Sequence, residues 1–231
     1  MITLSVTIMS GSFDASRRSM VERLIREIKP EWIAKLTVDF QVISDWWRNG
    51  PWPTAQRCWN HGDVVGATHH LLLQDDITVC DDFLLTVHEL ARAKPDAILG
   101  LYSNRKICDE AKAKDARWVE IPDGTWGQAI LMPTAKIGDF LAWECTHIKR
   151  SFKHDDSRVA LWCIHTKQQV LCPQPSLVDH AAPDKSLVGH GRSSRVARWF
   201  QKESPLHLDW AEGEILKGAI GMPKHYNEFV L

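Results

Sequence analysis

The sequence predicts an α/β protein with a mostly parallel central sheet that is flanked by helices on both faces. Over residues 1–104, apolar runs of strand length alternate with segments of helical periodicity, which is typical of strand–helix–strand units. At 231 residues the chain is also long enough to bury a substantial core.

In the first half the alternation is regular. The expected strands are residues 2–9, 35–44, 68–74 and 96–103. The expected helices are residues 16–28, 54–62 and 80–93. For the first helix, Ser16 is the predicted N-cap and Pro30 the predicted stop.

The second half is less regular. Strands are expected at residues 125–133 and 168–173, and helices at residues 134–144 and 155–166. Residues 175–192 are expected to form a long loop. The segment from about residue 203 shows no clear pattern, and we expect it to wrap back over the body of the protein.

Composition excludes several classes of protein. A net charge of -1 gives no global reason to bind nucleic acid or a membrane. The scattered cysteines contain no C-x-x-C pair, and no apolar stretch approaches the ~20 residues of a membrane span. The N-terminus lacks the basic region of a signal peptide, so we expect a cytoplasmic protein. No P-loop or G-x-G-x-x-G motif is present.

Two adjacent carboxylates, Asp75 and Asp76, follow the third expected strand. Ligands bind such sheets at the carboxyl ends of the strands, where the loops 10–16, 45–53 and 74–80 would meet. Neighbouring buried carboxylates repel each other, and a divalent cation would compensate them and bridge phosphate oxygens. The alternative is that both residues merely cap the following turn or helix.

The order of these pieces resembles the GT-A-fold nucleotide-sugar glycosyltransferases. Gln74-Asp75-Asp76 is similar to the D-x-D-like triplet that holds the metal and the diphosphate in that family. Gln74 replaces the first acid, which leaves Asp76 as the best metal ligand, beside Asp75. The resemblance implies one GT-A-like domain with a nucleotide-sugar-binding half (1–104), an acceptor and catalytic half (105–190) and a C-terminal extension (191–231).

The resemblance also implies the donor site. The segment "SVTIMSGSFDASRR" looks like the first strand and nucleotide-binding loop, with Ser10, Gly11 and Ser12. In "FQVISD", Asp45 would meet the base, and in "TAQRCWNHG", Arg57 would contact the diphosphate. Alone, Arg57 would be read as a solvated helix residue.

The resemblance further implies the catalytic groups. In "HDDSRVALW", the pair Asp155 and Asp156 looks like the acid pair of inverting members, with Asp156 as the base. In "PSLVDH", His180 would complete the metal shell, and in "GTWGQAI", Trp126 and Gly127 would line the acceptor side.

Each of these residues has an alternative interpretation. The acids could be favoured by the helix dipole and the histidine could lie on the surface. His69 and His70 alternate across a strand, and neither is assigned a role. Tryptophans in the loops could belong to the core or stack on a sugar ring; they are Trp46, Trp47, Trp52, Trp59 and Trp126.

The implied enzyme uses Mn²⁺ or Mg²⁺ and a nucleotide-sugar donor, with UDP as the expected nucleotide. "ATHHLLLQDD" and "PSLVDH" are most similar to small phage-encoded glycosyltransferases, some of which modify hydroxymethylated pyrimidines in DNA. In that case the location would be the host cytoplasm.

A basic stretch is the candidate DNA contact. Its members are Lys185, Arg192, Arg195, Arg198 and Lys202, and the last four would share one face of a helix. A solvated cationic helix is the alternative. The rival acceptor is a saccharide or a small molecule.

Two other functional classes are open. A sugar-nucleotide nucleotidyltransferase would share the sheet and the metal chemistry, but its Gly-rich opening loop fits "SGSFDASRR" poorly. A binding module without enzymatic activity would not need two pairs of acids.

Overall fold

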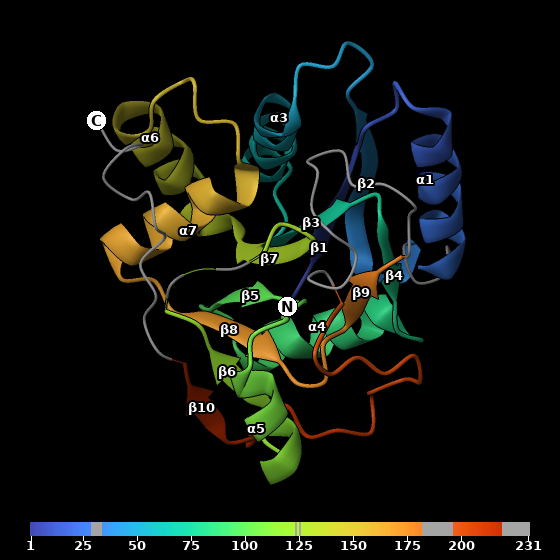
Figure 1. Ribbon diagram of the computed structural model, residues 1–231, viewed down its shortest axis with the longest axis vertical. Helices are drawn as coiled ribbons and strands as arrows, with labels where there is room; N and C mark the ends of the chain where they lie inside the picture. Colours follow the sequence, from blue (N-terminus) through green and yellow to red (C-terminus); the bar gives the residue numbers. More distant parts are fainter. Residues whose placement is uncertain (29–33, 123, 125, 182–195, 219–231) are drawn as a thin grey trace.

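The computed structural model describes residues 1–28, 34–122, 124, 126–181 and 196–218. Over these residues the protein is built on an eight-stranded sheet with the strand order β10-β6-β8-β5-β7-β3-β1-β2 (Figure 1). Its strands are β1 (Leu4–Ser10), β2 (Thr37–Ser44), β3 (His69–Gln74), β5 (Ile98–Gly100), β6 (Trp118–Glu120), β7 (Ala129–Pro133), β8 (Val170–Pro173) and β10 (Ile215–Lys217). The helices are α1 (Ala15–Glu27), α3 (Pro51–Val64), α4 (Phe83–Ala93), α5 (Ile107–Lys114), the short 3-10 helix η1 (Thr134–Lys136), α6 (Ile137–His147) and α7 (Asp155–Thr166).

The sheet is mixed but mostly parallel. β1 pairs in parallel with both β2 and β3, and β5 pairs in parallel with β8. β7 runs antiparallel between β3 and β5, while β6 and β10 run parallel to each other and β6 is antiparallel to β8. The predicted α/β class is therefore confirmed.

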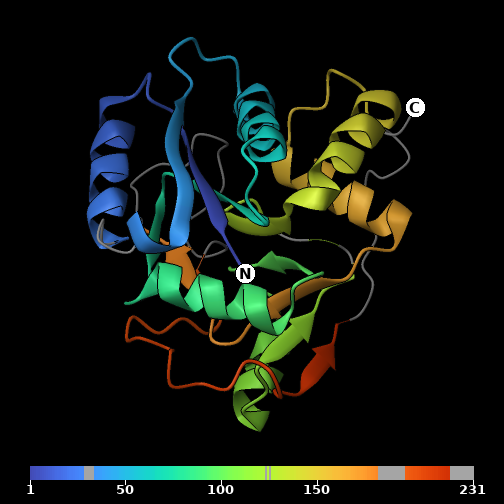
Figure 2. The ribbon, with the colours of Figure 1, turned by 180° about the vertical axis from the view of Figure 1, so that it is seen from behind.

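Two apolar cores lie on the two faces of the sheet. Leu71 and Leu73 of β3 point into a core with α1 and α4. Leu72, between them, points into a second core with α3, α6 and α7. This alternation follows from the two-residue period of a strand. Figure 1 shows α3, α6 and α7 grouped together, and Figure 2 shows α4 across the opposite face.

A second, two-stranded sheet joins β4 (Ile77–Val79) to β9 (Val178–His180) in antiparallel register. Ile77 pairs with His180, and Val79 pairs with Val178. The sequence predicted neither strand, and the expected loop over 175–192 is wrong at residues 178–180. Residues 182–192 lie outside the described part of the chain.

Several helix boundaries differ from the predictions for local reasons. The N-cap of α1 is Asp14 rather than Ser16, because the Asp14 carboxylate accepts a hydrogen bond from the Ser16 amide at 2.8 Å. α3 begins at Pro51, before the predicted start at residue 54, since proline is well accommodated in a first helical turn. This earlier start buries Trp52 as well as Trp59 in the second core.

The described part of the C-terminal segment does pack back on the body. The Trp118 indole donates to the Trp210 carbonyl at 3.0 Å, and β10 pairs with β6. This confirms the expectation for residues 203–218, while residues 219–231 are not described. Within the described residues, every helix is too short or too polar to cross a bilayer.

Candidate active site

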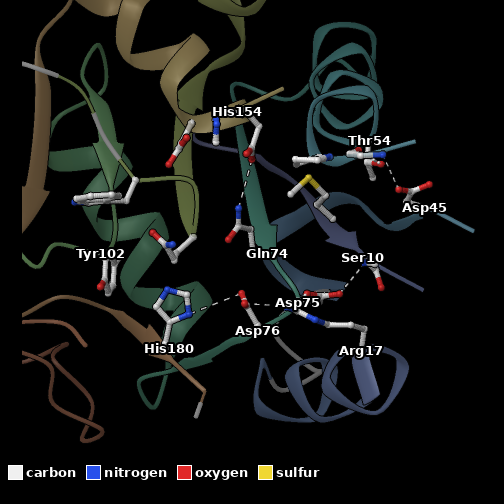
Figure 3. Close-up of a pocket in the computed structure, with 18 of the residues that line it drawn as sticks. Ser10, Arg17, Asp45, Thr54, Gln74, Asp75, Asp76, Tyr102, His154 and His180 are labelled. Atoms are coloured by element: carbon white, nitrogen blue, oxygen red, sulfur yellow. Dashed lines mark hydrogen bonds and ion pairs between the residues drawn. The ribbon is translucent and has the colours of Figure 1, made fainter. Parts of the chain in front are cut away.

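A cavity of about 630 Å³ opens at the edge of the sheet where β1, β2, β3 and β5 end. The three loops that the sequence placed at this edge contribute to its wall, as do the start of α7 and the residues before β7. The predicted site residues on the wall are Ser10, Gly11, Asp45, Gln74, Asp75, Asp76, Trp126, Asp155, Asp156 and His180. Figure 3 shows how several of these side chains face the same space.

Three residues that were predicted for the donor and acceptor sites do not line the cavity. Arg57 is exposed, and its guanidinium donates to the Ser44 carbonyl at 3.1 Å. Ser12 is buried beneath the wall, where its hydroxyl bonds the hydroxyls of Ser10 and Ser44, each at 2.9 Å. Gly127 lies behind the wall and is buried.

The arginine of the site is Arg17, which the sequence analysis did not select. Its guanidinium lies 2.6 Å from an Asp75 oxygen and 3.0 Å from an Asp76 oxygen (Figure 3). A sequence signal existed, because Arg17 falls on the same helical stripe as Val21 and Leu24, the buried face of α1. A charge on a buried stripe requires a partner.

The positive charge of Arg17 compensates the repulsion between the two adjacent carboxylates. Burial opposes the charge on Arg17, but Asp76 and Asp75 outweigh that effect and raise its pKa. Burial also raises the pKa of Asp75, while Arg17 and a hydrogen bond of 2.9 Å from the Gly11 amide favour its ionised form. Asp75 and Asp76 therefore form an ion cluster with Arg17.

His180 completes this part of the cavity. The pairing of β4 with β9 brings its Nδ1 atom to 3.9 Å from an Asp76 oxygen. The edge of its ring also contacts Tyr102, with 5.6 Å between the ring centres. We call Arg17, Asp75, Asp76 and His180 the cationic corner, after the guanidinium of Arg17 that compensates its two carboxylates.

The cationic corner offers a metal only part of a coordination shell. In the described ranges of the chain, no three His, Cys, Asp or Glu side chains gather closely enough to hold an ion by themselves. Its donor atoms are carboxylate oxygens and one imidazole nitrogen, which suit Mn²⁺ or Mg²⁺. Such ions commonly take their remaining ligands from water and substrate phosphates, so these residues fit a metal that binds together with a diphosphate.

On the opposite wall, Asp155 and Asp156 occupy the first turn of α7. The Gln74 side-chain amide donates to Asp155 Oδ2 at 3.4 Å, and Asp156 Oδ1 accepts from the Ser157 amide at 2.7 Å. Burial, together with the charge of Asp156, raises the pKa of Asp155 to about 7. We call Gln74, Asp155 and Asp156 the acidic corner.

Gly127 keeps the acidic corner compact. A Cβ atom at this position would lie 2.9 Å from the Gln74 amide nitrogen and 3.2 Å from Asp155 Oδ2. It would also lie 3.1 Å from the Asp156 Cβ. Only a residue without a side chain allows these groups to approach one another in this way.

Both carboxylate oxygens of Asp45 accept hydrogen bonds from amides of its own loop. One carboxylate oxygen accepts from the Asn49 amide at 2.9 Å, and the other accepts from the Gly50 amide at 3.0 Å. These bonds fix the loop that precedes α3 and place the Arg48 guanidinium 5.0 Å from the centre of the Phe13 ring. Arg48 and Phe13 both line the cavity, and neither was selected from the sequence.

The other wall residues that were missed include Tyr102, Asn104, Gln128 and His154. Tyr102 and Asn104 follow β5, so they lie at the sheet edge where the sequence analysis expected ligands, but the loop after β5 was not included. The side-chain oxygen of Gln128 is buried without a hydrogen-bond partner among the described residues.

Two histidines of β3 are structural. His70 is fully buried, and its ring nitrogens hydrogen-bond the Ser5 and Thr7 hydroxyls at 2.8 and 3.1 Å. Burial, assisted by His61, lowers its pKa to about 3. His69 hydrogen-bonds the Pro95 carbonyl at 3.0 Å, and neither ring lines the cavity.

The tryptophans divide between the core, the surface and the cavity. Trp52 and Trp59 are buried, whereas Trp46 and Trp47 are exposed on the loop after β2. Trp126 lines the cavity, and the Arg105 guanidinium lies 5.6 Å from its ring centre.

The single basic face that this stretch would have as a helix is not found in its described residues. Lys185, Arg192 and Arg195 lie outside the described residues. Residues 196–202 are not helical, and both basic side chains there contact the protein itself. Arg198 lies 3.5 Å from an Asp109 oxygen, and Lys202 donates to the Val79 carbonyl at 2.7 Å.

No protein-family model and no curated protein matches the sequence, whereas solved structures do. Mannosyltransferase PcManGT from Pyrobaculum calidifontis, solved with GDP-Man and Mn²⁺, aligns at 12% identity over 79% of this chain and 58% of its own, with a TM-score of 0.51. A Drosophila β1,4-galactosyltransferase 7 mutant, solved with manganese, UDP-Gal and xylobiose, aligns at 11% identity over 79% and 72% of the two chains, with a TM-score of 0.46. A197 from STIV aligns at 11% identity over 88% and 97%, also with a TM-score of 0.46. The first of these likenesses shows that this chain has the mixed α/β fold of the GT-A glycosyltransferases.

Proposed function

We propose that the protein is a metal-dependent glycosyltransferase that moves a sugar from a nucleotide-sugar to an acceptor hydroxyl. The observation that carries the proposal is one cavity with two different carboxylate pairs on opposite walls. The pair in the cationic corner is compensated by positive charge, whereas the pair in the acidic corner has a member whose pKa is about 7. Glycosyl transfer needs one site for a diphosphate leaving group and another for a proton acceptor.

In this proposal the donor diphosphate lies against the cationic corner. Asp76, beside Asp75 and His180, would supply protein ligands to Mn²⁺ or Mg²⁺ bound together with the diphosphate, and the ion would neutralise the charge of the leaving group. Arg17 takes the place that the sequence analysis gave to Arg57, because its guanidinium lies in the wall of the cavity and that of Arg57 does not.

The nucleoside would lie along the ends of β1 and β2. Ser10 and Gly11 form the wall there, and Ser12 supports Ser10 from below. Asp45 acts by fixing the loop that carries Arg48. UDP is the nucleotide that we propose, on the strength of the sequence resemblance.

The proton acceptor lies in the acidic corner. Asp156 would take the proton of the acceptor hydroxyl as its oxygen attacks the anomeric carbon from the face opposite the diphosphate, which gives inversion. Asp155, which accepts a hydrogen bond from Gln74, has a pKa raised to about 7 by burial and would keep its own proton up to about that pH. This division leaves Asp156 as the base.

A saccharide or small molecule is the acceptor that the cavity supports. Trp126 offers a ring face suited to a pyranose, and Gln128 offers a buried side-chain oxygen for a hydroxyl. For a hydroxymethylated pyrimidine in DNA, the described basic residues give no support, since Arg198 and Lys202 contact the protein itself.

A thermal-shift panel of nucleotide-sugars, with and without Mn²⁺, tests the proposal. A donor present at about 100 times its dissociation constant should stabilise the fold by about 2.7 kcal/mol, and only when Mn²⁺ is present. Incubation of that donor with hydroxyl acceptors should then yield a glycosylated product. The absence of any shift across the panel would contradict the proposal.

A further inference from the structure

Arg17 occupies the position from which a metal ion would compensate the two carboxylates. Its guanidinium contacts both of them, at 2.6 and 3.0 Å, and all three side chains are almost fully buried, with 7% of the Arg17 side chain and 5% of each carboxylate side chain exposed. The two oxygens of Asp75 are both engaged, one with Arg17 and the other with the Gly11 amide. Arg17 is therefore the counter-ion of both carboxylates.

A divalent cation that enters this cluster alone meets a fixed positive charge. The cluster carries a net charge of -1, from one guanidinium and two carboxylates. A divalent cation alone would make it +1, and a nucleotide-sugar alone, with one negative charge on each of its two phosphates, would make it -3. When both bind, the net charge of the cluster stays at -1. Each ligand therefore offsets the unfavourable change in buried charge that the other would cause alone.

We propose that Arg17 is an exchangeable counter-ion, which moves from the carboxylates to the donor diphosphate and thereby releases Asp76 to the divalent cation. Arg17 lies in the cavity wall, so its guanidinium reaches the cavity without leaving α1. A guanidinium also suits phosphate oxygens as well as carboxylates, because its donors are arranged in a planar fork.

The direct consequence is that nucleotide and metal bind cooperatively. The metal alone binds weakly, because it competes with Arg17 for Asp76. By reciprocity, each ligand strengthens the other by the same factor. This inference rests on the proposed function, and it names Arg17 as the residue that couples the two ligands.

The test measures Mn²⁺ binding to the full chain by electron paramagnetic resonance, with and without saturating UDP or GDP. In the wild type, one of these nucleotides should tighten Mn²⁺ binding by roughly tenfold or more. Arg17→Gln should bind Mn²⁺ alone roughly tenfold more tightly than the wild type, and its coupling to the nucleotide should shrink. Arg26→Gln removes the same charge from an exposed position about two and a half turns along α1, and it should behave as the wild type.

The melting temperature of Arg17→Gln is a second measurement, and it remains informative if this variant folds poorly. Arg17→Gln leaves two buried carboxylates without their cation, so its melting temperature should fall and be restored by Mn²⁺ far more than by NaCl of equal ionic strength. If the variant is unfolded in chelator, recovery of its fold on addition of Mn²⁺ is the same readout.

The outcomes separate the two proposals. If Mn²⁺ and a nucleotide bind the wild type independently, or Arg17→Gln gains no Mn²⁺ affinity, the exchange is overturned while the proposed function stands. If Arg17→Gln gains Mn²⁺ affinity but no nucleotide binds, Arg17 competes with the metal for the carboxylates, but both its transfer to a diphosphate and the nucleotide-sugar donor are overturned. Tighter Mn²⁺ binding by Arg17→Gln together with nucleotide coupling in the wild type supports both.

Discussion

The cationic and acidic corners present the same chemical unit, two adjacent aspartates, in opposite electrostatic settings. In the first, Arg17 lies within 3.0 Å of both carboxylates. In the second, no described residue forms an ion pair with Asp155 or Asp156, and the pKa of Asp155 rises to about 7. The counter-ion, rather than the carboxylate itself, therefore decides whether an acidic pair binds cations or exchanges protons.

The position of each pair in the fold explains this difference. Asp75 and Asp76 follow β3, which runs beside β1, and the helix after β1 delivers Arg17 to the same edge. Asp155 and Asp156 begin α7, and their nearest neighbours on the sheet side are Gln74 and Gly127, which carry no charge.

The largest expected effect comes from Asp76→Ala in the cationic corner. The variant should lose transfer by roughly a thousandfold, because a metal contribution of several kcal/mol disappears at about 1.4 kcal/mol per factor of ten. The fold should survive, since Arg17 keeps Asp75 as its partner. Steady-state transfer and Mn²⁺-dependent donor binding are the measurements, and Asp81→Ala, in an exposed position nearby, is the matched control. Unchanged Mn²⁺-dependent donor affinity in Asp76→Ala would remove the metal from this corner.

In the acidic corner, Asp156→Asn should reduce turnover by a factor of ~100 or more while donor binding is retained, as expected for the loss of a general base. Single-turnover kinetics and donor titration separate the two effects. Asp139→Asn makes the same change at an exposed site on α6 and should be neutral. Near-full activity of Asp156→Asn, combined with an inactive Asp155→Asn, would transfer the base to Asp155.

The raised pKa of Asp155 predicts a pH dependence of stability. A carboxyl that titrates near 7 in the folded state and near 3.8 in the unfolded chain stabilises the fold below about pH 4, and that contribution is lost as the pH rises through about 7. Asp155→Asn should therefore be more stable than the wild type at pH 8, by at least about 1 kcal/mol, and gain less at pH 5. Denaturant unfolding at both pH values is the measurement. The same difference in unfolding free energy between the two proteins at both pH values would show that Asp155 is not protonated near neutrality.

A smaller effect is expected from Gly127→Ala. The added methyl group would press on Gln74 and both acids at 2.9–3.2 Å, so turnover should fall by about tenfold, as the corner is displaced by a fraction of an ångström. Gly138→Ala on α6, whose new Cβ would meet only the Asp63 side chain at 3.3 Å or beyond, is the control. Equal kinetics for both variants would show that the acidic corner tolerates this displacement.

The smallest effect is expected outside both corners. If Arg198 and Lys202 contacted DNA phosphates, their double alanine variant would have a log–log salt slope shallower by roughly 1.8. We expect no change, since both side chains contact the protein itself. Salt titrations of binding to modified and unmodified duplexes measure this slope, and a difference near 1.8 would restore the DNA acceptor.

The sequence was sufficient for those parts of the fold that have strong local patterns. β1, β3 and α7 lie close to their predicted ranges, because long apolar runs and helical periodicity identify such elements. Strands as short as β4 and β9 have too few residues to show a period, and only their pairing across the chain defines them.

The candidate site likewise contains residues that local sequence patterns place correctly and residues that they do not. Residues that follow strands, such as Asp75 and Asp76, were placed correctly on the cavity wall, because strand ends share one edge of the sheet. Arg57 was chosen by its position in a motif, but its helix turns the side chain toward the Ser44 carbonyl. Arg17 was not predicted because the apolar period that marks the buried face of α1 gives no signal for a charged residue on that face.

The pairing of β4 with β9 has a consequence for how the protein unfolds and refolds. It joins segments roughly 100 residues apart, so closing this loop costs more chain entropy than forming the neighbouring helices does. With only three residues in each strand, the pair has little to offset that cost. We therefore expect the amides of β4 and β9 to exchange hydrogen through local openings that leave the large sheet intact, and His180 would then leave Asp76 each time such an opening occurs.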